Sequence, residues 1–156
     1  MTDLKNHWLV KLYVLYIKAA KFLPQVLLLA MRVIWGWQFF EAGKGKLGNL
    51  GGTAEFFAKL HIPLPHLNAF MAASTECFGG MLLLLGLGGR LVALPLTITM
   101  VVAYLTTELP VERFTQLLNA TPFMFLVTSV IVLCFGPGKL SIDYLISRFV
   151  IKNKPG

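Results

Sequence analysis

The sequence predicts an all-α protein, an integral membrane four-helix bundle with an N-terminal amphipathic helix at the interface and a short helix in an external loop. Of its 156 residues, 56% are hydrophobic and only 13% are charged, and the mean hydropathy is +0.72. The apolar residues gather in four runs close to the ~20 residues that cross a bilayer as a helix. None of these runs alternates as the strands of a barrel would. The length leaves room for a single domain, 1–156.

Proline placement supports the boundaries of the four spans. Pro24 and Pro122 fall in first turns, where a missing backbone N–H costs little. Pro110 and Pro137 follow the third and fourth runs, where they end a helix. The predicted spans cover about residues 22–42, 66–86, 90–108 and 117–135.

The segment before the first span has two faces. At helical spacing Lys11, Lys18 and Lys21 share one side, while Trp8 and Leu12 take another. A helix with such faces is typical of the membrane interface. We therefore expect an N-terminal interfacial helix in contact with lipid.

The basic residues indicate orientation and not nucleic-acid binding, despite the net charge of +7. They lie at the ends of apolar runs and do not cluster on one face. Nine of the fourteen Lys and Arg residues lie on the side of the two termini, and four lie on the opposite side. The excess predicts that both termini are cytoplasmic. We expect a multi-pass protein of a bacterial-type inner membrane.

The first external loop contains five glycines before the short run 53–60. Thr53 is a suitable cap, and Phe56, Phe57 and Leu60 form an apolar side. We expect a short amphipathic helix over the mouth of the bundle, with a glycine-rich connector as the alternative. Residues 141–151 are equally compatible with a second interfacial helix and an extended tail.

Two charges, Arg32 and Glu76, lie near the middle of their predicted spans. An isolated charge at the bilayer centre costs at least ~2.5–3.5 kcal/mol, so both should face inward and find partners. Since the first two spans run antiparallel, we expect a direct or water-bridged Arg32–Glu76 pair. Small residues that allow close helix approach accompany both charges: Gly36 and Gly43 on the helical stripe of Arg32, and Ala72, Ala73, Gly79 and Gly80 around Glu76.

The buried pair has two interpretations. Either it only fixes the packing and register of the helices, or it lies in a polar pocket that binds a ligand or relays protons. In the second case Lys46, on the same helical stripe as Arg32, serves the outer mouth. Trp35 and Phe39 are then either packing and interfacial residues or the flanks of a flat ring such as a quinone. We expect no metal site, because two loop histidines lack further ligands.

A set of motifs resembles the DoxX-like family of membrane proteins. Their order is Arg32-x3-Gly36-x2-Phe39-x3-Gly43-x2-Lys46, then Ile62-Pro63, Glu76 with Gly79-Gly80, Gly86-x3-Arg90, Ala103, and GPGKLSID ending at Asp143. The resemblance implies a four-helix membrane protein with redox associations, since the family's name comes from a membrane subunit of thiosulfate:quinone oxidoreductase. It also implies protein partners. The run FFEAGKGKL, together with IPLPHLNAFMAASTE, resembles family members encoded beside enzymes that make metal-binding peptides.

Two functions from different classes follow. The first is a membrane subunit of a quinone-linked redox complex, with the Arg/Glu site inside the bundle as the polar contact of a quinone. The alternative is a non-catalytic membrane scaffold or small-solute pathway, accessory to a metal-binding peptide system. A homo-oligomer stays open, because small residues pack helices both within a chain and between chains.

Overall fold

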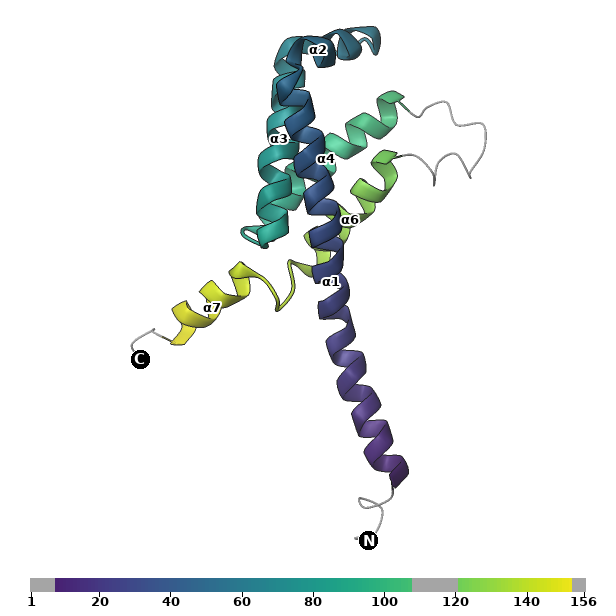
Figure 1. Cartoon of the computed structure of the whole chain (residues 1–156), viewed down its shortest axis with the longest axis vertical. Coiled ribbons are helices and arrows are strands. Elements are labelled where there is room, and N and C mark those ends of the chain that lie inside the picture. Colours follow the sequence, from purple (N-terminus) through teal and green to yellow (C-terminus); the bar gives the residue numbers. More distant parts are fainter. Residues whose placement is uncertain (1–7, 108–120, 153–156) are drawn as a thin grey trace.

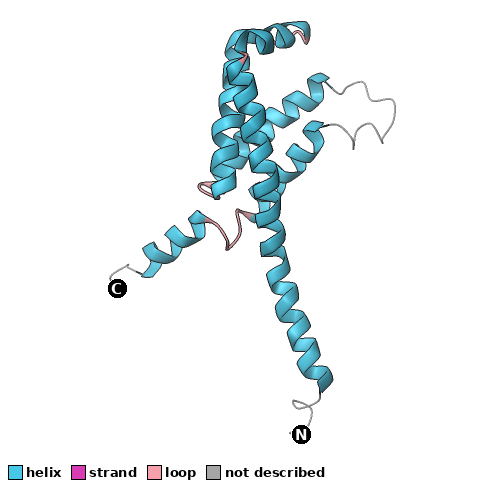
Figure 2. Cartoon of the chain, in the orientation of Figure 1, coloured by secondary structure: helices cyan, strands magenta, loops and turns pink. Residues whose placement is uncertain are grey.

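The computed structural model describes residues 8–107 and 121–152, and within them every regular element is a helix (Figures 1 and 2). This confirms the predicted all-α class. The helices are α1 (Trp8–Gly48), α2 (Leu50–Lys59), α3 (Pro65–Leu85), α4 (Gly89–Thr107), α6 (Thr121–Phe135) and α7 (Ile142–Lys152).

Three of these helices, α1, α3 and α4, are long and apolar enough to cross a membrane. The fourth predicted span corresponds to α6, whose 15 residues form a shorter apolar helix. Residues 108 and 117–120 of the predicted spans lie outside the described residues. The described helices form a membrane helical bundle, as the composition predicts.

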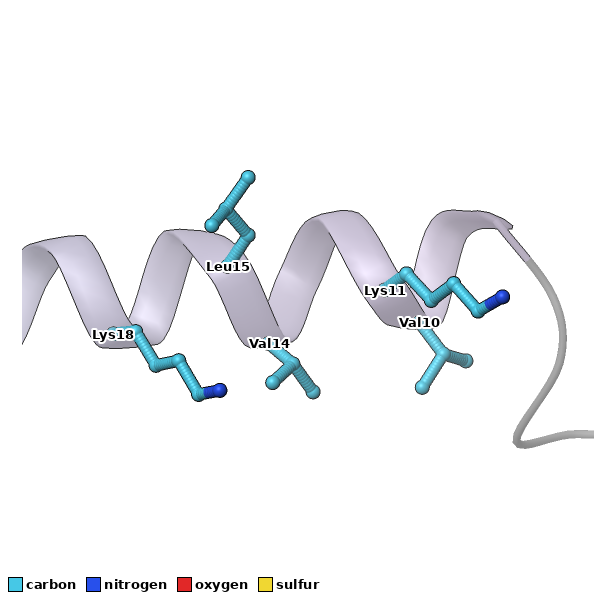
Figure 3. A pocket seen from close by; sticks show the side chains of 5 residues that line it. All are labelled: Val10, Lys11, Val14, Leu15 and Lys18. Atoms are coloured by element: carbon cyan, nitrogen blue, oxygen red, sulfur yellow. The ribbon is translucent and has the colours of Figure 1, made fainter.

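The first helix differs from its predicted bounds at both ends. It is one helix of 41 residues, ~60 Å long, so the expected interfacial helix is continuous with the first span. Figure 1 shows its N-terminal half extending away from the other helices. Figure 3 shows Val10, Val14 and Lys18 on one side of this part and Leu15 on the other. At its other end α1 continues through Gly43 and Gly45 to Gly48, where we expected loop.

Glycines hold α1 against α3 in an antiparallel contact. A Cβ at Gly43 would lie 2.8 Å from the Ala73 carbonyl oxygen and closer still to the backbone nitrogen of Cys77. A Cβ at Gly36 would meet the backbone of Leu84 at 3.0 Å, and one at Gly80 would meet the backbone of Phe40. At Gly43 and Gly80 a Cβ would collide with backbone atoms, so this approach requires glycine there. The contacts are consistent with the packing role predicted for Gly36, Gly43, Ala73 and Gly80.

The remaining predicted packing residues contact other parts of the bundle. A Cβ at Gly79 would lie 3.1 Å from the side chain of Leu96 on α4, so Gly79 serves the α3–α4 contact. Phe39, Leu83, Leu96, Phe125 and Val132 then form the buried core between α1, α3, α4 and α6. A hydrogen bond of 3.0 Å from the Thr97 hydroxyl to that of Ser129 links α4 to α6 inside this apolar layer.

Two short helices complete the fold: α2 follows α1, and α7 is the last helix of the chain that the structure describes. The predicted loop helix is α2, which lies across the end of the bundle (Figure 1). Its cap is Asn49 and not Thr53, because the Asn49 side chain accepts a hydrogen bond from the Gly52 N–H at 3.1 Å. At the opposite end of the bundle α7 is helical from Ile142, so of the two alternatives for 141–151 the helix is confirmed.

Candidate functional site

The clearest candidate for a functional site is an ion pair between Lys46 of α1 and Glu76 of α3. The Lys46 Nζ atom lies 2.5 Å from both carboxylate oxygens of Glu76. The Glu76 side chain is only 2% exposed, whereas that of Lys46 is 35% exposed. The carboxylate is therefore removed from solvent, and the ammonium that neutralises it remains accessible on one side.

The close contact of α1 with α3 positions this pair. Gly43 lies against Cys77, the residue after Glu76. Lys46 is three residues beyond Gly43 and so lies on the same helix face, one turn nearer the helix end. From the last turn of α1 its side chain reaches Glu76, and a cation there also complements the negative end of the helix dipole.

The pair forms part of the wall of a cavity of about 820 Å³. This volume is in the range of ligand pockets. The cavity is bounded by the end of α1, by α2, α3 and α4, and by Pro122 at the start of α6. It thus lies at the end of the bundle that α2 covers.

The cavity walls are mainly apolar, with a few polar groups. Thr99 and Thr106 donate their hydroxyl hydrogens to the carbonyl oxygens of Pro95 and Val102, at 2.9 and 2.8 Å. Their oxygens therefore remain acceptors. Further polar lining comes from Asn49, Thr53, Asn68 and Thr75, and apolar lining from Phe56, Phe57, Leu60, Met71, Ile98 and Val102.

The predicted Arg32–Glu76 pair is wrong. Glu76 pairs with Lys46, and the contacts of Gly36 with Leu84 and of Gly43 with Cys77 place Glu76 opposite residue 44 of α1. Arg32 is about twelve residues away from that position, or ~18 Å along the helix. Both charges lie mid-way along their apolar runs, but α3 packs against the C-terminal half of a much longer α1.

Arg32 is instead bound by backbone carbonyl oxygens at the other end of the bundle. Its Nε donates to Leu83 at 3.1 Å and its Nη2 to Leu84 at 3.4 Å. Its Nη1 donates to Pro137, and both terminal nitrogens lie 3.3 Å from the oxygen of Leu140. Arg32 is 1% exposed, so this arrangement joins α1, the end of α3 and the segment before α7 without a counter-ion among these partners.

Asp143 makes a second set of contacts at the same end of the bundle. The Asp143 carboxylate accepts hydrogen bonds from the N–H groups of Gly88 at 2.7 Å and Gly89 at 2.9 Å. Its own N–H donates to the Gly86 carbonyl oxygen at 3.1 Å. The GPGKLSID segment is thus fixed to the turn between α3 and α4, and we define the clasp as Arg32, Asp143 and the backbone groups they bind.

Trp35 and Phe39 are packing residues in this structure and do not line the cavity. Phe39 is fully buried, and its ring lies 4.4 Å from that of Phe125, edge to face. Trp35 makes a similar contact with Phe125 at 5.2 Å. Of the five predicted ligand residues, only Lys46 and Glu76 lie on the cavity, together with the predicted packing residue Ala72.

Sequence reasoning missed most of the cavity lining, although one signal was available. Thr99 and Thr106 are polar residues seven apart in an apolar span, so they share a helix face. The contribution of α2 had no comparable signal, because the direction in which a connecting helix lies is set by tertiary contacts.

Two other features carry no site. A hollow of about 260 Å³ beside Lys11 and Lys18 is lined by α1 alone, so it cannot enclose a ligand (Figure 3). Within residues 8–107 and 121–152, no three His, Cys, Asp or Glu side chains gather as a metal site.

Comparison with known proteins agrees with the membrane architecture. The DoxX family model matches residues 27–109. A protein of Bacillus subtilis named "Putative oxidoreductase CatD" is 33% identical over 127 residues, covering 81% of this chain and 88% of that protein. An uncharacterized protein of Haemophilus influenzae is 31% identical over 129 residues, covering 79% and 85% of the two chains. No solved structure matches the chain.

Proposed function

The chain belongs to the DoxX family of membrane proteins, and on that premise we propose that it is a membrane subunit of a quinone-linked redox complex in the inner membrane. The proposal has one main support, the 820 Å³ cavity with the Lys46–Glu76 pair in its wall. The name of the Bacillus subtilis relative supports the redox class. The site proposed here replaces the Arg/Glu site expected from the sequence.

The cavity suits the two parts of a quinone. Aromatic and aliphatic side chains of α2, α3 and α4, such as Phe56, Met71 and Val102, offer an apolar surface to a ring and its isoprenoid tail. The Lys46 ammonium offers a hydrogen bond to a ring oxygen, which becomes stronger as that oxygen gains negative charge on reduction. Glu76 holds the ammonium in place and is a candidate to exchange a proton with it.

The chain's part in this function is binding and proton handling. We propose that electrons come from a partner protein in the membrane complex, since the described residues that line the cavity include no redox-active side chain. We therefore assign Lys46 and Glu76 as ligand-binding residues. Arg32, Trp35 and Phe39 act through the fold.

The proposal is tested by quinone co-purification. The full-length protein is purified in mild detergent, its lipids are extracted, and quinone is measured by mass spectrometry relative to phospholipid. We expect enrichment in the wild type and its loss in Glu76→Gln. Glu41→Gln is the matched control, since Glu41 is an exposed carboxylate on α1 outside the cavity. Ala72→Leu, which fills the cavity without changing charge, should also lose quinone.

A quinone content equal to that of bulk lipid in the wild type contradicts the proposal. The non-catalytic scaffold or small-solute pathway, accessory to another membrane system, would then be the better description. Loss of quinone in Glu41→Gln as well would assign the effect to surface charge and not to the cavity.

A further inference from the structure

The cavity contains two charges that cancel. Among the described residues that line it, Lys46 and Glu76 are the only ones with ionisable acidic or basic side chains. Their contact at 2.5 Å makes the pair neutral as a unit, whether the proton lies on the nitrogen or on an oxygen. The described lining of the cavity therefore offers a strong hydrogen-bond donor and carries no net charge.

We infer that the cavity selects amphiphiles with an uncharged, hydrogen-bond-accepting head over anionic ones, and that Glu76 sets this selectivity. The inference deepens the proposed function, because it rests on the cavity as a ligand site and names the class of ligand. A lysine in an apolar pocket would alone favour a carboxylate, sulfonate or phosphate head. Glu76 removes that preference because its carboxylate already neutralises the Lys46 ammonium.

The geometry leaves Lys46 one donor for a ligand. An ammonium has three N–H donors, and the two oxygens of Glu76 account for two of them. The Lys46 side chain is 35% exposed and lies on the cavity wall, whereas Glu76 is nearly covered. A carbonyl oxygen can therefore accept a hydrogen bond from Lys46 without displacing Glu76.

An anionic head gains little at the same position. Any anion within hydrogen-bond reach of Lys46 also lies near the Glu76 carboxylate, so attraction and repulsion nearly cancel. The cost of taking the anion out of water remains, because the surrounding walls are mainly apolar. A neutral head avoids most of this cost, and its apolar chain gains equally from burial.

A pair of matched probes tests the charge preference directly. Decanesulfonamide and decanesulfonate share a chain and sulfonyl oxygens and differ in charge at neutral pH. Binding is measured by equilibrium dialysis to the full-length protein in phosphatidylcholine nanodiscs, with protein-free nanodiscs subtracted. We expect the wild type to bind the sulfonamide about tenfold more tightly, because only the sulfonate must give up the hydration of a charge to enter the mainly apolar cavity.

Charge variants test the role of Glu76. Glu76→Gln leaves the ammonium of Lys46 uncompensated, so the preference should reverse toward the sulfonate. Glu41→Gln removes the same unit of charge from an exposed position, and it should keep the wild-type preference. The double variant Lys46→Gln/Glu76→Gln restores a neutral cavity and should again prefer the sulfonamide, with weaker binding.

The outcomes separate this inference from the quinone proposal. Equal or tighter sulfonate binding by the wild type overturns the inference even if the variants do not fold. An unreversed preference in folded Glu76→Gln also overturns it. If the wild type prefers the neutral sulfonamide, Glu76→Gln prefers the sulfonate, and the purified protein carries no quinone, the inference is supported and only the quinone assignment is contradicted.

Discussion

At the scale of single residues, two cations of α1, the buried Arg32 and the partly exposed Lys46, are bound in different ways. Arg32 is bound by carbonyl oxygens of Leu83, Leu84, Pro137 and Leu140, whereas Lys46 is bound by a carboxylate. The planar guanidinium directs several donors along fixed directions, so it can join three chain segments. The compact ammonium suits a single partner and an exchangeable ligand.

The first prediction follows from this difference. Arg32→Lys keeps the charge but cannot reach the carbonyl oxygens of both the end of α3 and the segment before α7, so buried acceptors lose their donor. We expect the free energy of unfolding to fall by roughly 3 kcal/mol. The free energy of unfolding is measured in mixed micelles, with circular dichroism as the signal.

Probe binding separates the structural role of Arg32 from a ligand role. The variant, when folded, should bind decanesulfonamide as the wild type does, because Arg32 is not among the cavity residues. A stable Arg32→Lys protein that had lost ligand binding would instead return Arg32 to the functional site.

At the scale of elements, the sequence predicted which segments are helical better than how they pair. Hydrophobic run length predicts the described bounds of α3, α4 and α6 to within a few residues, and the amphipathic pattern predicts a helix over 53–60 where α2 covers 50–59. The register of α1 against α3 could not be predicted from run length or from the amphipathic pattern. It depends on the glycines after residue 42 being helical, and tertiary packing against α3 overrides their weak helix propensity. That extension is why Lys46, and not Arg32, contacts Glu76.

The second prediction tests the α1–α3 contact. Gly43→Ala would force a Cβ against the backbone nitrogen of Cys77 and to 2.6 Å from its Cα. Backbone atoms cannot move aside as a flexible side chain can. We expect a loss of about 1–3 kcal/mol in unfolding free energy and weaker binding of the neutral probe, since Lys46 and Glu76 would separate.

Gly45→Ala is the control for the same substitution on the same helix. No atom lies within 4 Å of its added Cβ, so only the backbone entropy changes. The protein should be stabilised by about 0.5–1 kcal/mol, with ligand binding unchanged. Equal thermal stability of the two variants would show that the close approach of α1 and α3 is not required.

At the scale of the whole molecule, the two ends of the bundle differ in kind. One end carries α2, the Lys46–Glu76 pair and the cavity. The other carries the clasp, in which Arg32 and Asp143 fix the GPGKLSID segment beneath the turn between α3 and α4. With the clasp at one end and the cavity at the other, a ligand site would face one side of the membrane while α7 meets lipid or a partner on the opposite side.

The third prediction concerns which end faces the cytoplasm. The sequence assigns nine of the fourteen basic residues, including Lys139 and Arg148, to the side of the termini, so the positive-inside rule predicts the clasp in the cytoplasm and α2 outside. The test uses single cysteines at Gly51 of α2 and Ser147 of α7, both exposed, with Cys77→Ala and Cys134→Ser as background.

A membrane-impermeant maleimide added to spheroplasts should label Gly51→Cys and leave Ser147→Cys unlabelled, and inverted vesicles should give the reverse. Labelling of Ser147→Cys in intact spheroplasts would place the termini outside. The cavity would then lie at the cytoplasmic end, and a redox partner would have to supply its electrons from that side.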